Sequence, residues 1–192
     1  MRLLLLCRHG QSLFNVAGVV NGDPARDRGL SDAGRAAAAG LGIQLAGVRI
    51  DLCVTSRFPR AQETARLALG TRDPEVLRVV DGDLDDIRIG ELEGRTLDEY
   101  RAWKHEHRPS DRFPGGESLD EAAARYARAF ERLANRTEDT ILCVCHEIPV
   151  RFAVNTAAGS ESRDGPFHDV ANATPYLFDE PALRRAVAGL RQ

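Results

Sequence analysis

Two histidines stand directly after apolar runs of the chain. Arg8 and His9 follow the run Leu3–Cys7, and His146 follows the run Thr140–Cys145. Continuous apolar runs of this length are typical of central strands in a parallel sheet. Because open α/β sheets bind their ligands at the carboxyl ends of the strands, we expect both histidines at one such edge.

A third apolar run, Asp51–Thr55, leads into a segment that contains Arg57 and Arg60. If the three strands are parallel neighbours, Arg57 or Arg60 joins Arg8 and the two histidines in one pocket. Guanidinium groups bind phosphate through charge-assisted hydrogen bonds. The spacing therefore predicts a site for a doubly charged oxyanion, and phosphate is the obvious candidate.

Histidine suits the role of nucleophile in phosphoryl transfer. Its unperturbed pKa of roughly 6.5 leaves the imidazole partly unprotonated near neutral pH. The rest of the protein supplies positioning and charge stabilisation. A leaving alkoxide also needs a proton, and the acidic segment 83–86, Asp-Leu-Asp-Asp, is the best source of that acid.

Weaker strand signals and helical patterns complete the set of elements. Val76–Val80 is a weaker strand candidate, and Pro175–Phe178 contains a proline and indicates an edge strand. Ser31 is an expected helix N-cap, and Ser118 with Glu121 resembles a capping box. The predicted helices are Ser31–Ala46, Pro59–Leu69, Leu97–His105, Ser118–Ala134, Pro149–Ala158 and Pro181–Leu190. Alternating strands and helices predict a three-layer α/β/α sandwich with a mostly parallel central sheet.

Composition indicates an ordinary globular protein. The 192 residues are 43% hydrophobic and carry a net charge of −3, which gives no reason to expect a nucleic acid or a membrane as partner. No apolar stretch near the start has the length of a membrane span or of a signal-peptide core. We therefore expect a single cytoplasmic domain over residues 1–192, as a monomer or a dimer.

All four cysteines lie in apolar, strand-like runs, at Cys7, Cys53, Cys143 and Cys145. Because no pair has CxxC spacing, we expect buried reduced thiols rather than a metal site or a disulfide framework. Cys143 and Cys145 alternate along one strand, so their side chains should share one face of the sheet.

In a series of short motifs, the chain resembles the histidine phosphatase superfamily, also called the phosphoglycerate mutase-like family. The motifs run in family order from residue 3 to about residue 151 and include the Arg-His-Gly (RHG) triplet at 8–10. The matching segments are Leu6–Ser12 with Asn15, Leu30–Gly34, Ser56 with Arg60–Ala61 and Thr64–Ala65, Leu84–Ile87 with Gly90–Glu91 and Glu93–Gly94, Pro114–Ser118, and Val144–His146. Each motif is modest alone, and together they are specific.

The resemblance implies roles position by position. His9 is the residue that would attack phosphorus and carry a transient phosphohistidine. Arg8, Arg60 and His146 would hold the phosphoryl oxygens, and Asn15 matches a position that often contacts the same group. The resemblance implies a small phosphorylated substrate, no metal and no other cofactor.

Two positions depart from the family pattern. Asp86 falls where the family usually has a glutamate general acid and is one methylene shorter, so Asp85 and Glu91 remain alternatives. Glu147 follows the second histidine, where glycine is common; it could repel the substrate, orient that histidine or contact a substrate hydroxyl. We expect Gly22 and Glu147 as possible substrate contacts.

Three functions are compatible with this pattern. A phosphomonoesterase acting on a small metabolite is favoured over a cofactor-dependent phosphoglycerate mutase. A mutase must keep water from its intermediate through added segments, and the stretch between Gly94 and Pro114 holds no large insertion. A non-catalytic phosphate-binding or interaction module is a third possibility, supported only by Glu147 and the shorter acid.

Substrate specificity is expected to come from segment 94–116 and from the residues after His146. The first segment contains several aromatic and basic residues, namely Tyr100, Trp103, Lys104, His105, Arg108 and Arg112. Such side chains suit a polar, further charged leaving group. Sugar phosphates, phosphoglycerates, nucleotides and cofactor precursors all remain candidate substrates.

Overall fold

Five strands form a sheet whose spatial order differs from their order in the chain. The computed structural model describes residues 1–70 and 76–192. The strands are β1 (Leu3–Arg8), β2 (Leu52–Thr55), β3 (Leu77–Val80), β4 (Thr140–Cys145) and β5 (Pro175–Phe178), and they lie in the order β3-β2-β4-β1-β5. Neighbours from β3 to β1 are parallel, and β5 is antiparallel to β1. The predicted mostly parallel sheet, with the proline-containing strand at its edge, is confirmed.

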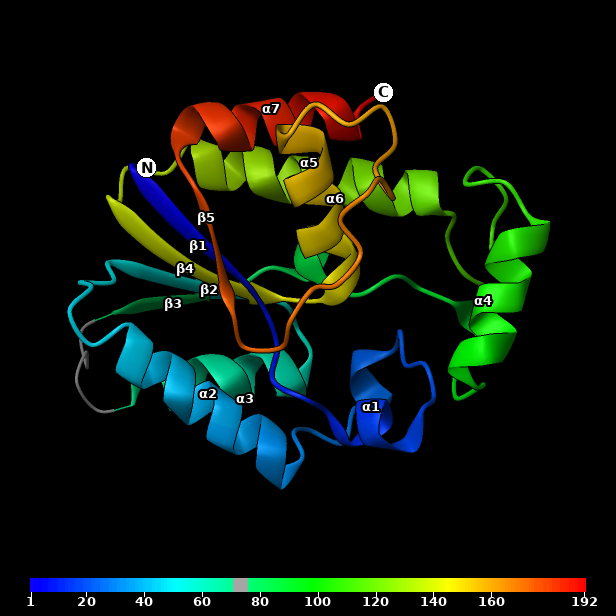
Figure 1. Ribbon diagram of the computed structural model, residues 1–192, viewed down its shortest axis with the longest axis horizontal. Helices are drawn as coiled ribbons and strands as arrows, with labels where there is room; N and C mark the ends of the chain where they lie inside the picture. Colours follow the sequence, from blue (N-terminus) through cyan, green and yellow to red (C-terminus); the bar gives the residue numbers. More distant parts are fainter. Residues whose placement is uncertain (71–75) are drawn as a thin grey trace.

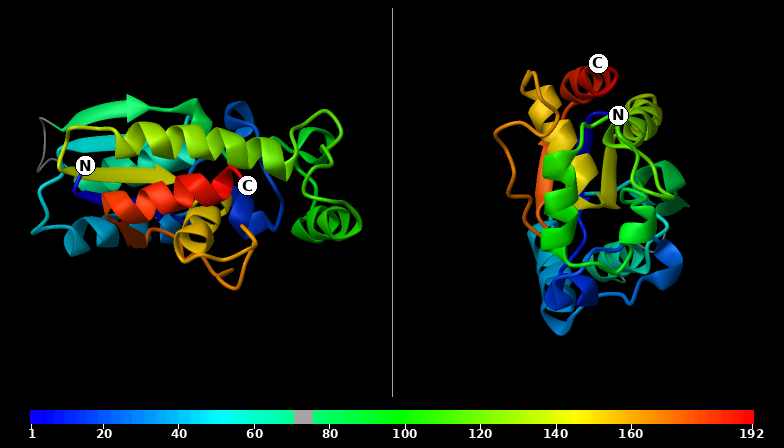
Figure 2. Two further views of the ribbon diagram at one scale, coloured as in Figure 1. Left: turned by 90° about the horizontal axis from the view of Figure 1, so that it is seen from above. Right: turned by 90° about the vertical axis from the view of Figure 1, so that its right-hand side faces the viewer.

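Helices cover both faces of this sheet (Figure 1). One face carries α2 (Asp32–Gln44) and α3 (Pro59–Leu69), and the other carries α5 (Leu119–Ala134), α6 (Glu147–Ala157) and α7 (Glu180–Leu190). Two further helices, α1 (Leu13–Ala17) and α4 (Leu97–Glu106), lie beyond the carboxyl ends of the parallel strands (Figure 1 and Figure 2). The three-layer α/β/α architecture is therefore confirmed, and α1 and α4 are additions at the edge that matters for ligand binding.

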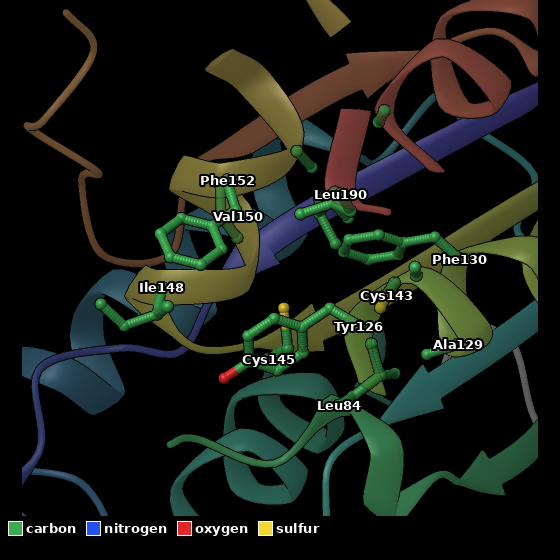
Figure 3. Packing of buried hydrophobic residues seen from close by; sticks show 14 of the residues in the cluster. Leu84, Tyr126, Ala129, Phe130, Cys143, Cys145, Ile148, Val150, Phe152 and Leu190 are labelled. Carbon is green, nitrogen blue, oxygen red and sulfur yellow. The ribbon is translucent and has the colours of Figure 1, made fainter. Parts of the chain in front are cut away.

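Alternate residues of the central strands divide the core into two clusters. Leu4 and Leu6 of β1 pack into the cluster under α5, α6 and α7, whereas Leu5 and Cys7 pack into the cluster under α2 and α3. A strand places successive side chains on opposite faces, so a run that is apolar throughout fits burial on both sides. Figure 3 shows the first cluster, with Tyr126 of α5 close to Cys145 of β4.

The structure also tests the predictions of buried, reduced cysteines and of a chain without a membrane-spanning helix. All four cysteines are buried and free, and Cys143 and Cys145 lie in the same core cluster. Over residues 1–70 and 76–192, no helix is long and apolar enough to cross a membrane.

Helix caps largely follow the sequence signals. The Ser31 hydroxyl accepts from the Gly34 amide, and Ser118 forms a capping box with Glu121. The prediction that the helix after β4 begins at Pro149 is wrong, because α6 begins at Glu147 with His146 as its N-cap. The first four helical N–H groups have no acceptor within the helix, so a proline at the third position costs no hydrogen bond there.

Helix α1 was not expected from the sequence, because its five residues are too few to display an apolar period. A capping box between Ser12 and Asn15 holds its start. Three short 3₁₀ turns, Pro24–Arg26, Gly82–Leu84 and Gly90–Leu92, lie in the segments that border the site.

Two glycines allow the segment after β1 to lie against the start of α2. A Cβ at Gly10 would sit 2.5 Å from the carbonyl oxygen of Gly34, and a Cβ at Gly34 would sit 2.0 Å from that of Gln11. Both distances are too short for any side chain. This close approach fixes the path of the chain directly after His9.

Candidate active site

The two histidines that follow apolar runs meet at the carboxyl edge of the sheet. Strands β1 and β4 are parallel neighbours, and the His9 amide donates to the Cys145 carbonyl at 3.0 Å. The ring centroids of His9 and His146 lie 5.2 Å apart. Arg8, His9, Arg60 and Asp86 line one cavity of about 160 Å³ at this edge. The predicted juxtaposition of these residues is thus present.

The His9 imidazole has a defined orientation. Its Nδ1 lies 2.7 Å from the Gly10 carbonyl oxygen. A carbonyl can only accept, so Nδ1 carries the hydrogen and Nε2 keeps its lone pair. The Nε atom of Arg60 donates to this Nε2 at 3.1 Å. Burial, followed by the charges of Arg60 and Arg8, lowers the pKa of His9 well below its usual value. The unprotonated, nucleophilic form is therefore favoured.

His146 is fully buried and held at both ring nitrogens. Its Nε2 shares a hydrogen bond of 2.8 Å with the Ser56 hydroxyl, at the end of β2. Its Nδ1 faces Nη2 of Arg60 at 3.3 Å and Oδ2 of Asp86 at 3.4 Å. Burial and the Arg60 charge lower the pKa of His146 well below its usual value. Arg60 thus stands between both imidazoles and the carboxylate.

Arg60 occupies this position because several groups clamp it at the start of α3. Its guanidinium donates to the Asn21 side chain at 2.5 Å and lies over the Phe58 ring at 4.2 Å. Its backbone amide donates to Asp27 at 2.7 Å. Glu93 in turn accepts from the Asn21 amide group at 2.6 Å. Sequence reasoning missed Asn21 and Asp27, since isolated polar residues in an irregular segment have no pattern that marks them.

Asp86 is the carboxylate of the acidic segment that reaches the cavity. Its Oδ2 accepts from Nη2 of Arg60 at 3.2 Å, and its Oδ1 accepts from the Ile87 amide. Burial raises the pKa of Asp86; the charge of Arg60 opposes this rise and that of Glu147 adds to it. A raised pKa suits a group that must hold a proton before donating it.

The alternative acids lie elsewhere. Asp85 is buried and binds the Arg57 side chain at 2.7 Å and the Arg57 amide at 2.9 Å. Glu91 is exposed and does not line the cavity. Since Arg57 pairs with Asp85, it is Arg60 and not Arg57 that joins the two histidines.

A buried ion pair from α5 holds the segment that carries Asp86. Arg125 donates to the backbone carbonyls of Asp83 and Asp85 at 2.9 Å and of Asp86 at 3.2 Å. Its guanidinium also binds Glu117 at 2.5 Å. The Arg125 and Glu117 side chains are only 4% and 7% exposed. Sequence reasoning did not find Arg125, because its position on a helix resembles that of any surface arginine.

The remaining predicted contacts differ in what they offer a ligand. Arg8 lines the cavity but binds the Val170 carbonyl at 2.9 Å and Glu147 at 3.0 Å. Asn15 lines it too, and its Oδ1 accepts from the Ser12 amide, so its NH₂ group is the end left to act as donor.

Gly22 lines the cavity, and packing explains why this position has no side chain. Its amide already donates to Glu93 at 2.7 Å, and a Cβ there would lie 2.2 Å from the Ile87 carbonyl oxygen. The residue after the second histidine, Glu147, also lines the cavity. The Glu147 carboxylate binds Arg8 and also Arg151 at 3.3 Å, and no hydrogen bond joins it to His146 in the described chain.

Most of the expected specificity residues lie outside the cavity. Of the six aromatic and basic residues of segment 94–116, only Tyr100 is among the described residues that line it. Trp103 stacks on Phe113 at 4.1 Å, Lys104 pairs with Asp164 at 3.2 Å, and Arg112 pairs with Glu121 at 2.9 Å. A helix directs a single stripe to one neighbour, so α4 presents Leu97 and Tyr100 to the cavity and its other side chains elsewhere.

The part of the chain that the structure describes contains no group of three or more His, Cys, Asp or Glu residues arranged to hold a metal ion. The charged and titratable groups that line the cavity are one imidazole, two guanidiniums and two carboxyls, from His9, Arg8, Arg60, Asp86 and Glu147. The fully buried imidazole of His146 does not line it and contacts Arg60 and Asp86 instead. Such a set can bind a phosphoryl group, attack its phosphorus and deliver a proton.

A known protein family and several known proteins are similar to this chain. The model of the "Histidine phosphatase superfamily (branch 1)" matches residues 4–181. A "2,3-bisphosphoglycerate-dependent phosphoglycerate mutase" from Methylobacterium sp. is 37% identical over 136 residues, which cover 65% of this chain and only 64% of that protein. A protein of the same name from Gloeothece citriformis is 32% identical over 221 residues, covering 93% of this chain and 94% of that protein.

Solved structures of phosphatases are also similar. The alpha-ribazole phosphatase from Shigella flexneri has a TM-score of 0.80 at 26% identity, over 92% of this chain and 90% of that chain. A mycobacterial glucosyl-3-phosphoglycerate phosphatase has a TM-score of 0.65 at 30% identity, over 82% and 81% of the two chains.

Proposed function

This chain belongs to the histidine phosphatase superfamily, whose members are phosphatases or mutases, and from that premise we propose that it is a phosphomonoesterase. In this proposal it hydrolyses a small phosphorylated metabolite without a metal, through a phosphohistidine on His9. The observation that carries the proposal is the buried imidazole of His9, whose unprotonated Nε2 adjoins Arg60.

In the first step, Nε2 of His9 attacks phosphorus and the bond from phosphorus to the leaving oxygen breaks. Arg8 and Arg60, which line the cavity, bind the oxygens of the transferred group together with His146, which contacts Arg60. The NH₂ group of Asn15 adds a further donor. Arg60 supports this role because its guanidinium lies within hydrogen-bond distance of both imidazoles. Fixed donors around phosphorus stabilise the charge that develops on its oxygens.

Asp86 serves as acid and then as base. Its proton goes to the leaving oxygen as the alcohol departs. In the second step, the Asp86 carboxylate accepts a proton from water while the water oxygen attacks phosphorus and the bond to Nε2 breaks. Phosphate leaves and the enzyme returns to its starting state. The raised pKa of Asp86 supports this cycle, since the acid must start protonated.

The test is hydrolysis of p-nitrophenyl phosphate in the presence of EDTA, with the variant His9→Ala. We expect turnover in the wild type and its loss in His9→Ala with the fold retained. His105→Ala is the matched control, because His105 is exposed and lies outside the cavity. Near wild-type hydrolysis by His9→Ala would refute the nucleophile assignment.

A second candidate is a cofactor-dependent phosphoglycerate mutase, favoured by the names of the curated relatives. It shares the phosphohistidine and differs in returning the phosphoryl group to an acceptor hydroxyl. An assay of 3-phosphoglycerate isomerisation with added 2,3-bisphosphoglycerate separates the two functions. If neither hydrolysis nor isomerisation is found, the non-catalytic phosphate-binding module becomes the better interpretation.

A further inference from the structure

The cavity changes character from its buried end to its mouth. The polar groups that would hold a phosphoryl group include His9 and Arg60, which are each 3% exposed. Much of the remaining wall is apolar and is formed by Phe14, Val19, Val20, Leu97, Tyr100 and Ile148. Leu97 is 38% exposed and lies nearer the solvent. A phosphate bound at His9 would therefore direct its leaving group along apolar surface.

Backbone hydrogen bonds fix this wall. The segment after α1 is joined to the segment before α4, with the Leu97 amide donating to the Gly18 carbonyl at 2.9 Å and the Val20 amide to the Arg95 carbonyl at 2.9 Å. An isolated antiparallel bridge joins Val19 and Thr96. Because main-chain atoms hold the wall together, a wall side chain such as Leu97 can be replaced without removing these bonds.

The charges around the wall argue against a second anionic group on the substrate. Among the described residues that line the cavity, Arg8 and Arg60 are the only cations. Arg60 is shared among His9, Asn21 and Asp86. Arg8 is paired with Glu147, whose side chain is 36% exposed. A carboxylate on the leaving group would meet Glu147 without an unpaired cation in this cavity.

We propose that this wall is a leaving-group subsite for uncharged, largely hydrocarbon alcohols, and that Glu147 disfavours phosphomonoesters bearing a second anion. The inference rests on the proposed phosphoryl site and adds the class of substrate. An apolar alcohol would take the place of the polar leaving group expected from the aromatic and basic residues of segment 94–116. Each methylene removed from water contributes about 0.8 kcal/mol to transfer, so each should tighten binding roughly four-fold.

Alkylphosphonates test the subsite by binding alone, because their carbon–phosphorus bond is not hydrolysed. Dissociation constants of methyl-, ethyl- and n-butylphosphonate are measured by calorimetry, together with that of 3-phosphonopropionate, whose chain ends in a carboxylate. We expect affinity to rise three- to four-fold per methylene. We also expect 3-phosphonopropionate to bind at least ten-fold more weakly than n-butylphosphonate.

Two variants with matched controls assign these preferences to residues. Leu97→Gln should reduce the butyl-to-methyl affinity ratio at least three-fold, whereas Ile43→Gln, at an exposed position of α2, should leave the ratio unchanged. Glu147→Gln should narrow the gap between n-butylphosphonate and 3-phosphonopropionate at least three-fold. Asp98→Asn removes the same charge from an exposed position of α4 and should not narrow it.

A second pocket beside the cavity could bind the second anion of a substrate, which is the outcome opposite to the one we expect. It shares Arg8 and Glu147 with the cavity and also contains Arg101 and Arg151. If the second anion of a substrate binds there, 3-phosphonopropionate will bind more tightly than n-butylphosphonate, and the inference is wrong. Equal affinities across the alkyl series, or no binding of n-butylphosphonate at millimolar concentration, would also overturn it.

The proposed phosphatase activity is tested by the hydrolysis assay, and the subsite is tested by phosphonate binding, so the two can fail separately. Loss of p-nitrophenyl phosphate hydrolysis in His9→Ala, combined with a flat phosphonate series, would leave the phosphatase standing and refute the subsite alone. Conversely, a graded phosphonate series in a protein that hydrolyses no phosphomonoester would support the subsite and refute the phosphatase.

Discussion

At the scale of single residues, Arg60 sets the chemistry of the site. Its guanidinium contacts His9, His146 and Asp86, which are the proposed nucleophile, an oxyanion ligand and the acid. Burial lowers the pKa of both imidazoles, and the positive charge of Arg60 adds to this effect. For Asp86, burial outweighs the arginine and raises the pKa. One cavity thus lowers the pKa of the proposed base and raises the pKa of the proposed acid.

Asp86→Asn should separate substrates by their leaving groups. Asparagine cannot donate the proton that an alkoxide needs, whereas p-nitrophenolate departs without one. We expect kcat/KM for n-butyl phosphate to fall about 10²- to 10⁴-fold, and kcat/KM for p-nitrophenyl phosphate to fall far less. The measurement is kcat/KM for both esters in both proteins, since this ratio reports the first phosphoryl transfer. Equal losses would show that Asp86 is not the acid.

Folding stability should depend on the buried imidazole of His9. Its pKa is lowered in the folded state, so below the unfolded value of 6.5 the unfolded chain binds a proton that the folded chain does not. The free energy of unfolding should therefore fall as pH drops through 6.5, by about 1 kcal/mol for this group between pH 7.5 and 5.5.

Urea unfolding of wild type and His9→Gln at both pH values measures that contribution by difference. The comparison cancels the opposite effect of Asp86, whose raised pKa makes the folded state bind protons more readily. The wild type should lose about 1 kcal/mol more than His9→Gln. His105→Gln, at an exposed position, should behave as the wild type, and an equal loss in His9→Gln would contradict the assignment.

At the scale of elements, α5 positions the acid without touching the cavity. Arg125 binds three carbonyls of the segment that carries Asp86 and pairs with the buried Glu117. Arg125→Met leaves Glu117 buried and unpaired, which should cost about 3–5 kcal/mol of stability. It should also lower kcat/KM more for n-butyl phosphate than for p-nitrophenyl phosphate, as expected for a displaced acid.

Two further variants make this prediction specific. Arg128→Met removes an exposed arginine of the same helix that pairs with Asp83, and it should change both quantities little. Arg125→Met combined with Glu117→Gln removes the unpaired charge and should recover part of the stability. If the double variant also recovers the activity on n-butyl phosphate, Arg125 does not position the acid.

At the scale of the whole molecule, the site joins segments that are distant in the sequence. His9 follows β1, His146 follows β4 and Arg60 lies in α3. One phosphate bound by these residues would therefore link the ends of two strands with a helix. Phosphate should therefore stabilise the entire fold. At 100 times its dissociation constant it should add about 2.7 kcal/mol, which corresponds to a rise in Tm of roughly 5–10 °C for a chain of this size.

Thermal denaturation over a phosphate titration checks this stabilisation. Arg60→Met should lose most of the shift in Tm, because it removes the cation shared by the site. Arg66→Met, at an exposed position of the same helix, should keep the shift. A full shift in Arg60→Met would mean that phosphate stabilises the protein by binding elsewhere.

The sequence by itself determined the elements and the edge at which the chemistry gathers. Apolar runs mark β1, β2 and β4, because strands buried on both faces need apolar side chains at every position. Caps such as Ser31 mark helix starts, because a helix leaves its first N–H groups without acceptors. The polar residues that directly follow the strands could be assigned to one site because the carboxyl ends of parallel strands lie at the same edge of the sheet.

Tertiary structure alone decided which of several similar side chains face the cavity. Neighbouring Asp85 and Asp86 look alike in the sequence, yet one pairs with Arg57 and the other with Arg60. The contact of Arg8 with the Val170 carbonyl joins residues 162 positions apart. Strand and helix signals reside in short windows of sequence, whereas such contacts depend on how distant segments pack. The charges near the acid and the apolar wall for the leaving group are therefore properties of the folded chain.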